Sequence, residues 1–117
     1  MNSRYLSVNE QYLAPQITPS SGDSVKYPEV TDGKGKVVVA AYPGLEVGQT
    51  INCYVKGNGT EFSSIEIKDV QPQYEAALKF NLVFEEASVD TGYFVSDADG
   101  NVIGSSAERR YTVLDRP

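Results

Sequence analysis

Tyr42-Pro-Gly-Leu-Glu-Val-Gly-Gln-Thr-Ile-Asn-Cys-Tyr-Val-Lys-Gly57 is the stretch that decides the fold. Its first half is turn chemistry, because proline fixes φ and glycine reaches conformations that other residues avoid. Its second half alternates between apolar and more polar side chains, in the order Ile51, Asn52, Cys53, Tyr54, Val55, Lys56. A period of two is typical of a strand with one buried face. The stretch therefore predicts a turn followed by a half-buried strand.

Similar segments recur on both sides of this stretch. Alternating or β-branched runs predict strands at 36–41, 50–56, 64–70, 78–84, 93–96 and 107–114, with an edge strand within 13–18. The segment 71–77 is open between irregular structure and one helical turn. Turn signals come roughly every 8–12 residues, a spacing typical of antiparallel sandwiches and barrels. We expect a sandwich in which Ile51, Phe80 and Val95 share one interior.

Composition excludes several classes of function. The 117 residues fit one domain, and 40% hydrophobic and 22% charged residues are in the globular range. The net charge of −6 without a basic stripe disfavours nucleic acid and anionic membranes, and no apolar run approaches the ~20 residues needed for membrane insertion. There is no histidine, and the one cysteine, Cys53, is expected to be a buried, inert thiol. We find no phosphate loop, zinc spacing or dinucleotide fingerprint and predict that the protein is not an enzyme.

The first 22 residues differ from the rest. They are polar and contain Pro15 and Pro19, so we predict an irregular N-terminal arm at 1–22 and a folded domain at 23–117. The opening residues lack the apolar region of a Sec signal, so we expect a cytoplasmic or particle-associated protein, or export by another route. The arm could tether the domain to a neighbour by strand addition. Removing residues 1–20 is then expected to abolish assembly and leave the domain folded.

The pattern resembles the bacterial immunoglobulin-like repeat modules of large Gram-negative surface and adhesin-type proteins. The likeness covers roughly residues 13–114, and a family tryptophan is replaced by Val55. It is carried by Tyr42-Pro-Gly-Leu45, Gly48-Gln-Thr-Ile51, Tyr54, Gly57, Leu78-Lys-Phe80, Gly92 to Asn101, Ser105-Ser106 and Tyr111-Thr-Val113. The resemblance implies an all-β, immunoglobulin-like antiparallel β-sandwich of about seven strands. It also implies a structural or recognition module of a bacterium or phage, acting in adhesion or in a surface or tail-like particle assembly.

In an immunoglobulin-like sandwich, the loops 42–49, 71–77 and 97–103 would gather at one end. They would bring together the candidate binding residues Tyr42, Tyr74, Asp97, Asp99 and Asn101. Aromatic faces beside carboxylate and amide groups suit a protein or glycan partner, because tyrosine adds contact area at low entropic cost. The alternative is that Tyr42-Pro43-Gly44 is only turn and core-edge chemistry.

A second function class is a divalent-cation-binding domain that uses the acidic window 85–108. Asp97, Asp99, Asn101 and Glu108 partly match the spacing of oxygen ligands in a calcium loop. However, the glycine of the loop falls at the fourth position instead of the sixth, and strands flank it. Asp-Gly-Asn is also the chemistry of a tight hairpin. Calcium is therefore the weaker hypothesis, and the leading prediction is a protein without a cofactor.

Overall fold

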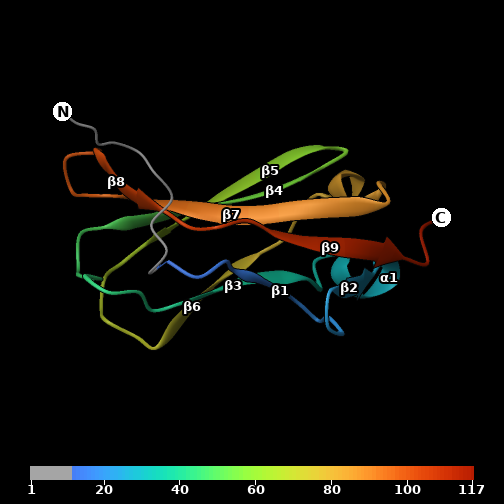
Figure 1. The fold of residues 1–117 in the computed structure, drawn as a ribbon, viewed down its shortest axis with the longest axis horizontal. Helices are drawn as coiled ribbons and strands as arrows, with labels where there is room; N and C mark the ends of the chain where they lie inside the picture. The colour runs from blue at the N-terminus through green and yellow to red at the C-terminus, as the bar shows by residue number, and fades with distance from the viewer. Residues whose placement is uncertain (1–11) are drawn as a thin grey trace.

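Two β-sheets packed face to face make up the chain in a computed structural model that describes residues 12–117 (Figure 1). The first eleven residues of the predicted arm lie outside the described residues. The elements are β1 (Gln16–Thr18), β2 (Ser24–Lys26), α1 (Tyr27–Val30), β3 (Lys36–Ala40), β4 (Thr50–Gly57), β5 (Gly59–Glu66), β6 (Gln73–Ala77), the 3-10 helix η1 (Asn81–Phe84), β7 (Ser88–Ser96), β8 (Val102–Ser105) and β9 (Arg109–Leu114). The chain is mostly β, as predicted, and it is a sandwich.

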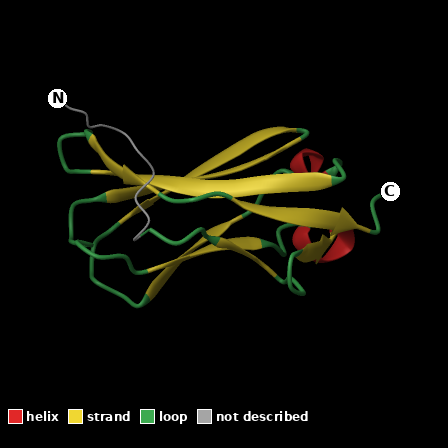
Figure 2. Cartoon of the chain, viewed as in Figure 1, coloured by secondary structure: helices red, strands yellow, loops and turns green. Residues whose placement is uncertain are grey.

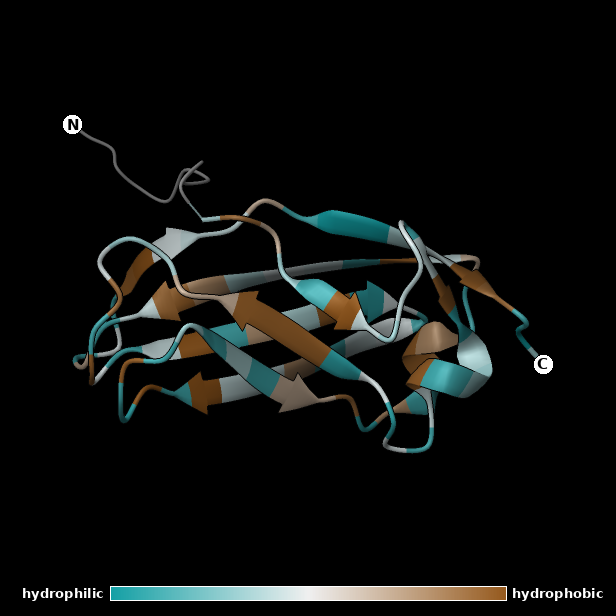
Figure 3. Ribbon diagram, turned by 90° about the horizontal axis from the view of Figure 1, so that it is seen from below, coloured by the Kyte–Doolittle hydropathy of each residue, from teal (hydrophilic) through white to brown (hydrophobic). Residues whose placement is uncertain are grey.

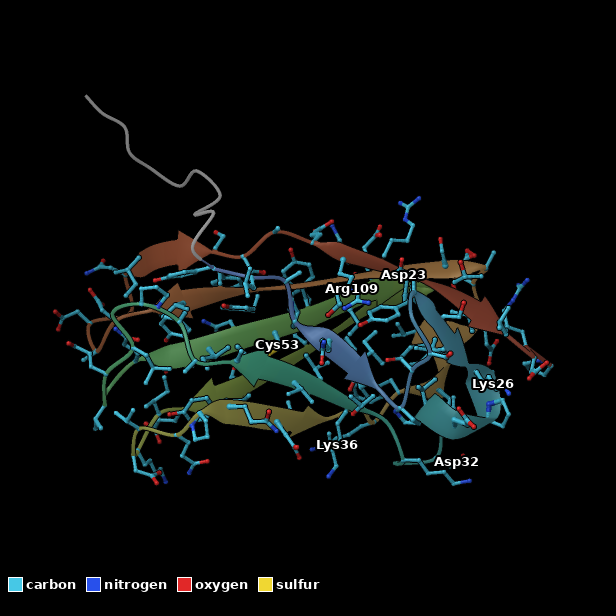
Figure 4. The ribbon with its side chains drawn as sticks, turned by 60° about the horizontal axis from the view of Figure 1, so that its bottom comes forward. Asp23, Lys26, Asp32, Lys36, Cys53 and Arg109 are labelled. Carbon is cyan, nitrogen blue, oxygen red and sulfur yellow. The ribbon has the colours of Figure 1, made fainter. Side chains whose placement is uncertain are left out.

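The smaller sheet has the order β1-β3-β6, and both of its pairings are antiparallel. The larger sheet has the order β2-β9-β7-β4-β5. β7 is its longest strand, and it pairs with β9 along its first half and with β8 along its second half. β2 joins β9 in parallel. Asp23, the residue before β2, lies 3.0 Å from the Arg109 guanidinium. Figure 4 labels both side chains.

The core lies between the sheets and is built by the inward residue of each alternating pair. In β4 these are Ile51, Cys53 and Val55, each at most 1% exposed, which confirms the predicted faces of that strand. Cys53 lies between the two layers in Figure 4. On the smaller sheet, Val37 and Val39 of β3 are buried, and Figure 3 shows that strand as hydrophobic along most of its length.

The segment 78–84 is not the predicted strand. Leu78 and Phe84 are buried, but Phe80 and Leu82 are 60% and 56% exposed, and residues 81–84 form η1. The expectation that Phe80 shares an interior with Ile51 and Val95 is therefore wrong, although the other two residues are fully buried. The two short helices lie near one end of the sandwich (Figure 2). Neither helix among residues 12–117 has the length and hydropathy needed to span a membrane.

Residues 12–117 contain nine strands where the sequence predicted about seven. The ambiguous segment is a strand, β6, and β5 begins at Gly59, directly after a turn at Asn58, several residues before the predicted start at 64. The last predicted strand, 107–114, is preceded by the separate short strand β8. β2 lies in a segment for which no strand was predicted.

The described part of the predicted arm is attached to the sandwich. The expected edge strand is present as β1, which pairs with β3. Ile17 is completely buried, and its backbone N–H donates to the Tyr111 hydroxyl at 3.2 Å. Tyr12 is 5% exposed and belongs to the same core. The expectation that the domain folds without residues 1–20 conflicts with this packing.

Candidate functional site

Three loops meet at the end of the sandwich opposite the helices (Figures 1 and 2). They are the β3–β4 loop (41–49), the β5–β6 loop (67–72) and the β7–β8 turn (97–101). Backbone hydrogen bonds link the first two at Gly48 N to Ile67 O, Ile67 N to Gln49 O and Ala41 N to Pro72 O, all within 3.0 Å. A Cβ placed on Gly48 would lie 3.7 Å from the Ala98 Cβ, so the third loop touches the first. We call these three loops the loop end.

The two predicted tyrosines lie underneath the loop end. Tyr42 is 6% exposed and Tyr74 is 7% exposed, so their rings are not presented at the surface. The Tyr42 hydroxyl donates to Gln49 Oε1 at 2.6 Å, and Gln49 Nε2 donates to the Gly44 carbonyl at 3.0 Å. The Tyr74 hydroxyl donates to the Asp69 carbonyl at 2.7 Å. Both hydroxyls therefore brace the loops from inside.

Tyr42 belongs to a cluster of buried aromatic rings. Its ring centroid lies 4.8 Å from that of Tyr12 and 6.1 Å from that of Tyr93. Desolvation by burial, followed by the neighbouring hydroxyls of Tyr12, Tyr93 and Tyr74, raises the pKa of Tyr42 well above its ordinary value. The phenol therefore stays neutral at physiological pH, packs against the other rings and donates a hydrogen bond. This is the role that the alternative hypothesis, turn and core-edge chemistry, assigns to Tyr42.

Asp97, Asp99 and Asn101 form a closed hairpin turn. Asp97 Oδ1 accepts the backbone N–H groups of Asp99 and Asn101, both at 2.9 Å. The backbone closes the same turn through Asp97 N to Asn101 O at 2.8 Å, and Gly100 has φ +86°, a conformation that favours glycine. The Asp97 side chain is thus engaged by its own loop, while Asp99 and Asn101 are exposed.

Glu108, the fourth residue of the calcium-like spacing, lies away from that turn. Its Cγ lies 3.3 Å from the position of a Cβ on Gly92, five residues before Asp97 along β7, which is roughly 16 Å of strand. Its carboxylate accepts from the Tyr54 hydroxyl and contacts Lys56 Nζ, each at 2.8 Å. Residues 12–117 contain no group of three or more His, Cys, Asp or Glu side chains placed to hold a metal ion.

The exposed apolar residues of the loop end were missed by the sequence reasoning. Val47 is 59% exposed and Val70 is 66% exposed, each near the middle of its loop. Val47 carried a sequence signal, because it is a β-branched residue in the predicted loop 42–49, whereas Val70 lay at the end of the predicted strand 64–70 and carried none. Ile103, at 45% exposure, lies just after the β7–β8 turn.

Charge at the loop end is strongly negative. The three loops carry four acidic residues and one lysine, so they hold half of the chain's net charge of −6. Lys68 is itself 3.8 Å from the carboxylate of Glu66. The acidic residues are Glu46, Asp69, Asp97 and Asp99. Exposed aliphatic groups among carboxylates suit a partner that is both basic and apolar.

Cys53, the one thiol of the chain, is unsuited to nucleophilic chemistry. It is 1% exposed, and desolvation by burial raises its pKa to about 12. A thiol of that pKa is almost entirely protonated near neutral pH, and the thiolate is the reactive form. No protein-family model, curated protein or solved structure matches the chain.

Proposed function

We propose that the chain is a non-enzymatic, immunoglobulin-like binding module that recognises a basic partner protein through its loop end. The observation that carries the proposal is a rigidly braced set of three loops exposing Val47 and Val70 among four carboxylates. Binding residues concentrate on loops held by a rigid scaffold. A protein partner is favoured over a glycan because Tyr42 and Tyr74, which would have stacked on sugars, are buried.

The strand order supports the immunoglobulin-like part of the proposal. In that fold one sheet pairs A, B and E, and the other pairs C, F and G, with an added C′ strand in variable-type domains. Here β1-β3-β6 fits A-B-E, and β4, β7 and the β8–β9 pair fit C, F and G. β5 then takes the place of C′, and the loop end corresponds to the end that carries the binding loops of variable domains.

The setting we propose is a surface or particle assembly of a bacterium or its phage. It rests on the resemblance of the segments around Tyr42–Gly57 and Gly92–Asn101 to bacterial repeat modules. In such an assembly a small sandwich serves as a connector, and an acidic, apolar loop end gives it one orientation toward its neighbour. Electrostatic complementarity would steer the encounter, and the valines would supply the desolvated contact.

The test uses a defined probe, a random peptide library displayed and selected on the wild-type protein. We expect enriched peptides that combine lysine or arginine with apolar residues. Binding of a selected peptide should weaken at least tenfold in the double variant Val47→Ser, Val70→Ser, and it should weaken further as salt rises.

The matched control is Phe80→Ser, which removes an equally exposed apolar side chain far from the loop end. It should leave peptide affinity unchanged. Enrichment of acidic or uncharged peptides, or full binding by the double valine variant, would overturn the proposal.

A further inference from the structure

The outer face of the larger sheet carries a strongly exposed aromatic side chain, Phe62. On β5, Phe62 is 68% exposed, and it lies directly across from Tyr54 of β4 in the strand register. Tyr54 in turn lies across from Gly92 of β7, and its ring occupies the space that a Cβ on Gly92 would need. The glycine thus lets the ring lie flat on the sheet, so Phe62 projects beside a level surface.

Beyond Tyr54 the same face has an open pocket. It has a volume of about 380 Å³ and is lined by Tyr54, Tyr93, Phe94, Val102 and Ser105. Phe62 lies on the far side of Tyr54 from this pocket, two to three strands away, which is about 10–14 Å. One face therefore holds an exposed phenyl ring and, at a fixed distance from it, an apolar recess.

The charge on this face differs from that of the rest of the molecule. The charged side chains that point outward from its described strands, together with Glu108, carry equal positive and negative charge. The three basic residues are Lys26, Lys56 and Arg110, and the three acidic residues are Glu66, Asp90 and Glu108. Several of them are already paired, as Lys56 is with Glu108 and Arg110 is with Asp90, both at 2.8 Å. On a chain with a net charge of −6, this is a surface on which contact between two copies brings no excess of like charge together.

We propose that two copies of this chain associate through the outer face of the larger sheet, as a two-fold dimer in which Phe62 of each copy enters the pocket of the other. A two-fold axis requires a self-complementary patch, where residue i of one copy meets residue j of the other and the reverse. Phe62 and the pocket lie on one face, on either side of Tyr54. A two-fold rotation therefore places the Phe62 ring of each copy at the pocket of the other.

The available area predicts a reversible dimer. Five strands about 4.8 Å apart and about seven residues long span a face of roughly 550 Å². Two such faces bury about 1,100 Å² in total, close to the lower limit for specific interfaces and below the ~1,600 Å² of standard ones. We therefore expect a dissociation constant on the order of micromolar to tens of micromolar.

The experiment is sedimentation velocity on the full-length protein, from about 0.1 to about 500 µM, a range that brackets such a constant. The wild type should shift from monomer to dimer. Phe62→Asp, which alters the projecting ring, and Val102→Asp, which alters the pocket wall, should each raise the dissociation constant at least tenfold. Both positions are exposed enough for folding to be preserved, and circular dichroism checks it.

Phe80→Asp is the matched control, since Phe80 is 60% exposed but follows β6 of the other sheet. It should dimerise like the wild type. A wild type that stays monomeric at the highest concentration would overturn the proposal and leave the face to a different partner. So would a loss of dimer in Phe80→Asp equal to that in Phe62→Asp. Added salt should not dissociate the dimer, which separates this interface from the salt-sensitive loop end.

Discussion

Glu61 places a carboxylate on the inner face of β5, where a hydrophobic side chain is usual. It is 3% exposed, and its two oxygens accept the backbone N–H groups of Lys79 at 2.7 Å and Phe80 at 3.3 Å. Because hydrogen bonds to a charged group are stronger than neutral ones, this side chain fastens the larger sheet to the segment that follows β6. These two N–H groups bond to a side chain and not to a neighbouring strand, which accounts for the missing strand at this point.

We expect Glu61→Ala to lower the free energy of unfolding by about 2–4 kcal/mol, because two partly buried donors lose their acceptor. Glu61→Gln keeps one acceptor oxygen and should lose roughly half as much. Urea unfolding measures both. Glu66→Ala, on the same strand but exposed, is the control and should stay within about 0.5 kcal/mol of the wild type. Equal effects at the two glutamates would contradict this role of Glu61.

Gly57 ends β4 where the chain approaches η1 most closely. A Cβ at this position would overlap the Val83 carbonyl oxygen and lie 2.7 Å from the Val89 Cγ1. The same carbonyl accepts the backbone N–H of Asn58 at 3.1 Å, so it cannot move away without breaking that bond. The glycine is therefore required by a close backbone approach.

Gly57→Ala should destabilise the protein by at least about 2 kcal/mol, since it overpacks a contact with backbone atoms. Asn58→Ala changes the exposed neighbour and keeps the backbone hydrogen bond, so thermal unfolding should show a much smaller loss. A Gly57→Ala melting curve that overlays the wild type would show that Val83 moves without cost.

Single residues also show where sequence reasoning about the site failed. Two of the predicted loops, 42–49 and 97–103, largely lie at the loop end, whereas most of 71–77 is strand β6 and the third loop is 67–72. The turns were predictable because residues such as Pro43 and Gly44 have local signatures. The orientation of Tyr42 and Tyr74 has no such signature. Their hydroxyls find acceptors on Gln49 and on the Asp69 backbone, and those partners exist only in the folded chain. A tyrosine suits both a surface and a core, and tertiary contacts decide between them.

At the scale of elements, the predictions succeeded where a strand carries its own alternation. β4 was predicted almost to its ends, and its two faces were assigned correctly. The segment 78–84 alternates just as regularly, yet its residues obtain their partners from Glu61 and η1. β6 looked ambiguous because Tyr-Glu-Ala-Ala has good helix propensity, and pairing with β3 overrides it. The period of the side-chain pattern does not indicate which strand will be the pairing partner.

Two ion pairs lie on the outer face of the larger sheet: Arg110 of β9 pairs with Asp90 of the neighbouring β7, and Glu108, just before β9, pairs with Lys56 of β4 across β7. Hydrogen bonding to Arg110 lowers the pKa of Asp90, and hydrogen bonding to Lys56, followed by that to Tyr54, lowers the pKa of Glu108. A carboxyl whose pKa falls on folding stabilises the protein above its unfolded pKa and loses that contribution as pH falls through the folded pKa. The ordinary values are 3.8 and 4.5, so the loss occurs below about pH 4.5.

We therefore expect Arg110→Gln to be slightly less stable than the wild type at pH 7, because the Arg110 side chain is 70% exposed and solvent screens the pair. The difference should shrink as the pH falls below 3.8, because the pair is lost as pH falls through the lowered pKa of Asp90. Urea unfolding at pH 7 and at a series of lower pH values checks it. Lys68→Gln, whose pair with Glu66 is longer and more exposed, should show no pH-dependent difference. A stability gap for Arg110→Gln that persists in acid would contradict the pairing.

At the scale of the whole molecule, the sandwich depends on its first described residues. Tyr12 stacks on Tyr93, with centroids 6.1 Å apart, and closes the core beneath the loop end. Ile17 fills the core between the sheets, and β1 forms one edge of the smaller sheet. A polar, proline-containing sequence concealed this role, because only three residues of its described part, Tyr12, Pro15 and Ile17, are buried.

The whole-molecule prediction is that deletion of residues 1–20 destabilises the domain instead of leaving it folded. It removes three buried residues, among them the large side chains of Tyr12 and Ile17, each worth about 2–5 kcal/mol in a core, and it exposes the edge of β3. A chain beginning at Tyr12 keeps every described contact and is the matched control. Thermal unfolding should show a large drop in the midpoint, or loss of the cooperative transition, for the 1–20 deletion and little change for the control. If the 1–20 deletion melted like the wild type, β1 and Tyr12 would be attached to the sandwich without being part of its core. This segment could then leave the sandwich and pair with a neighbouring molecule without destabilising the fold.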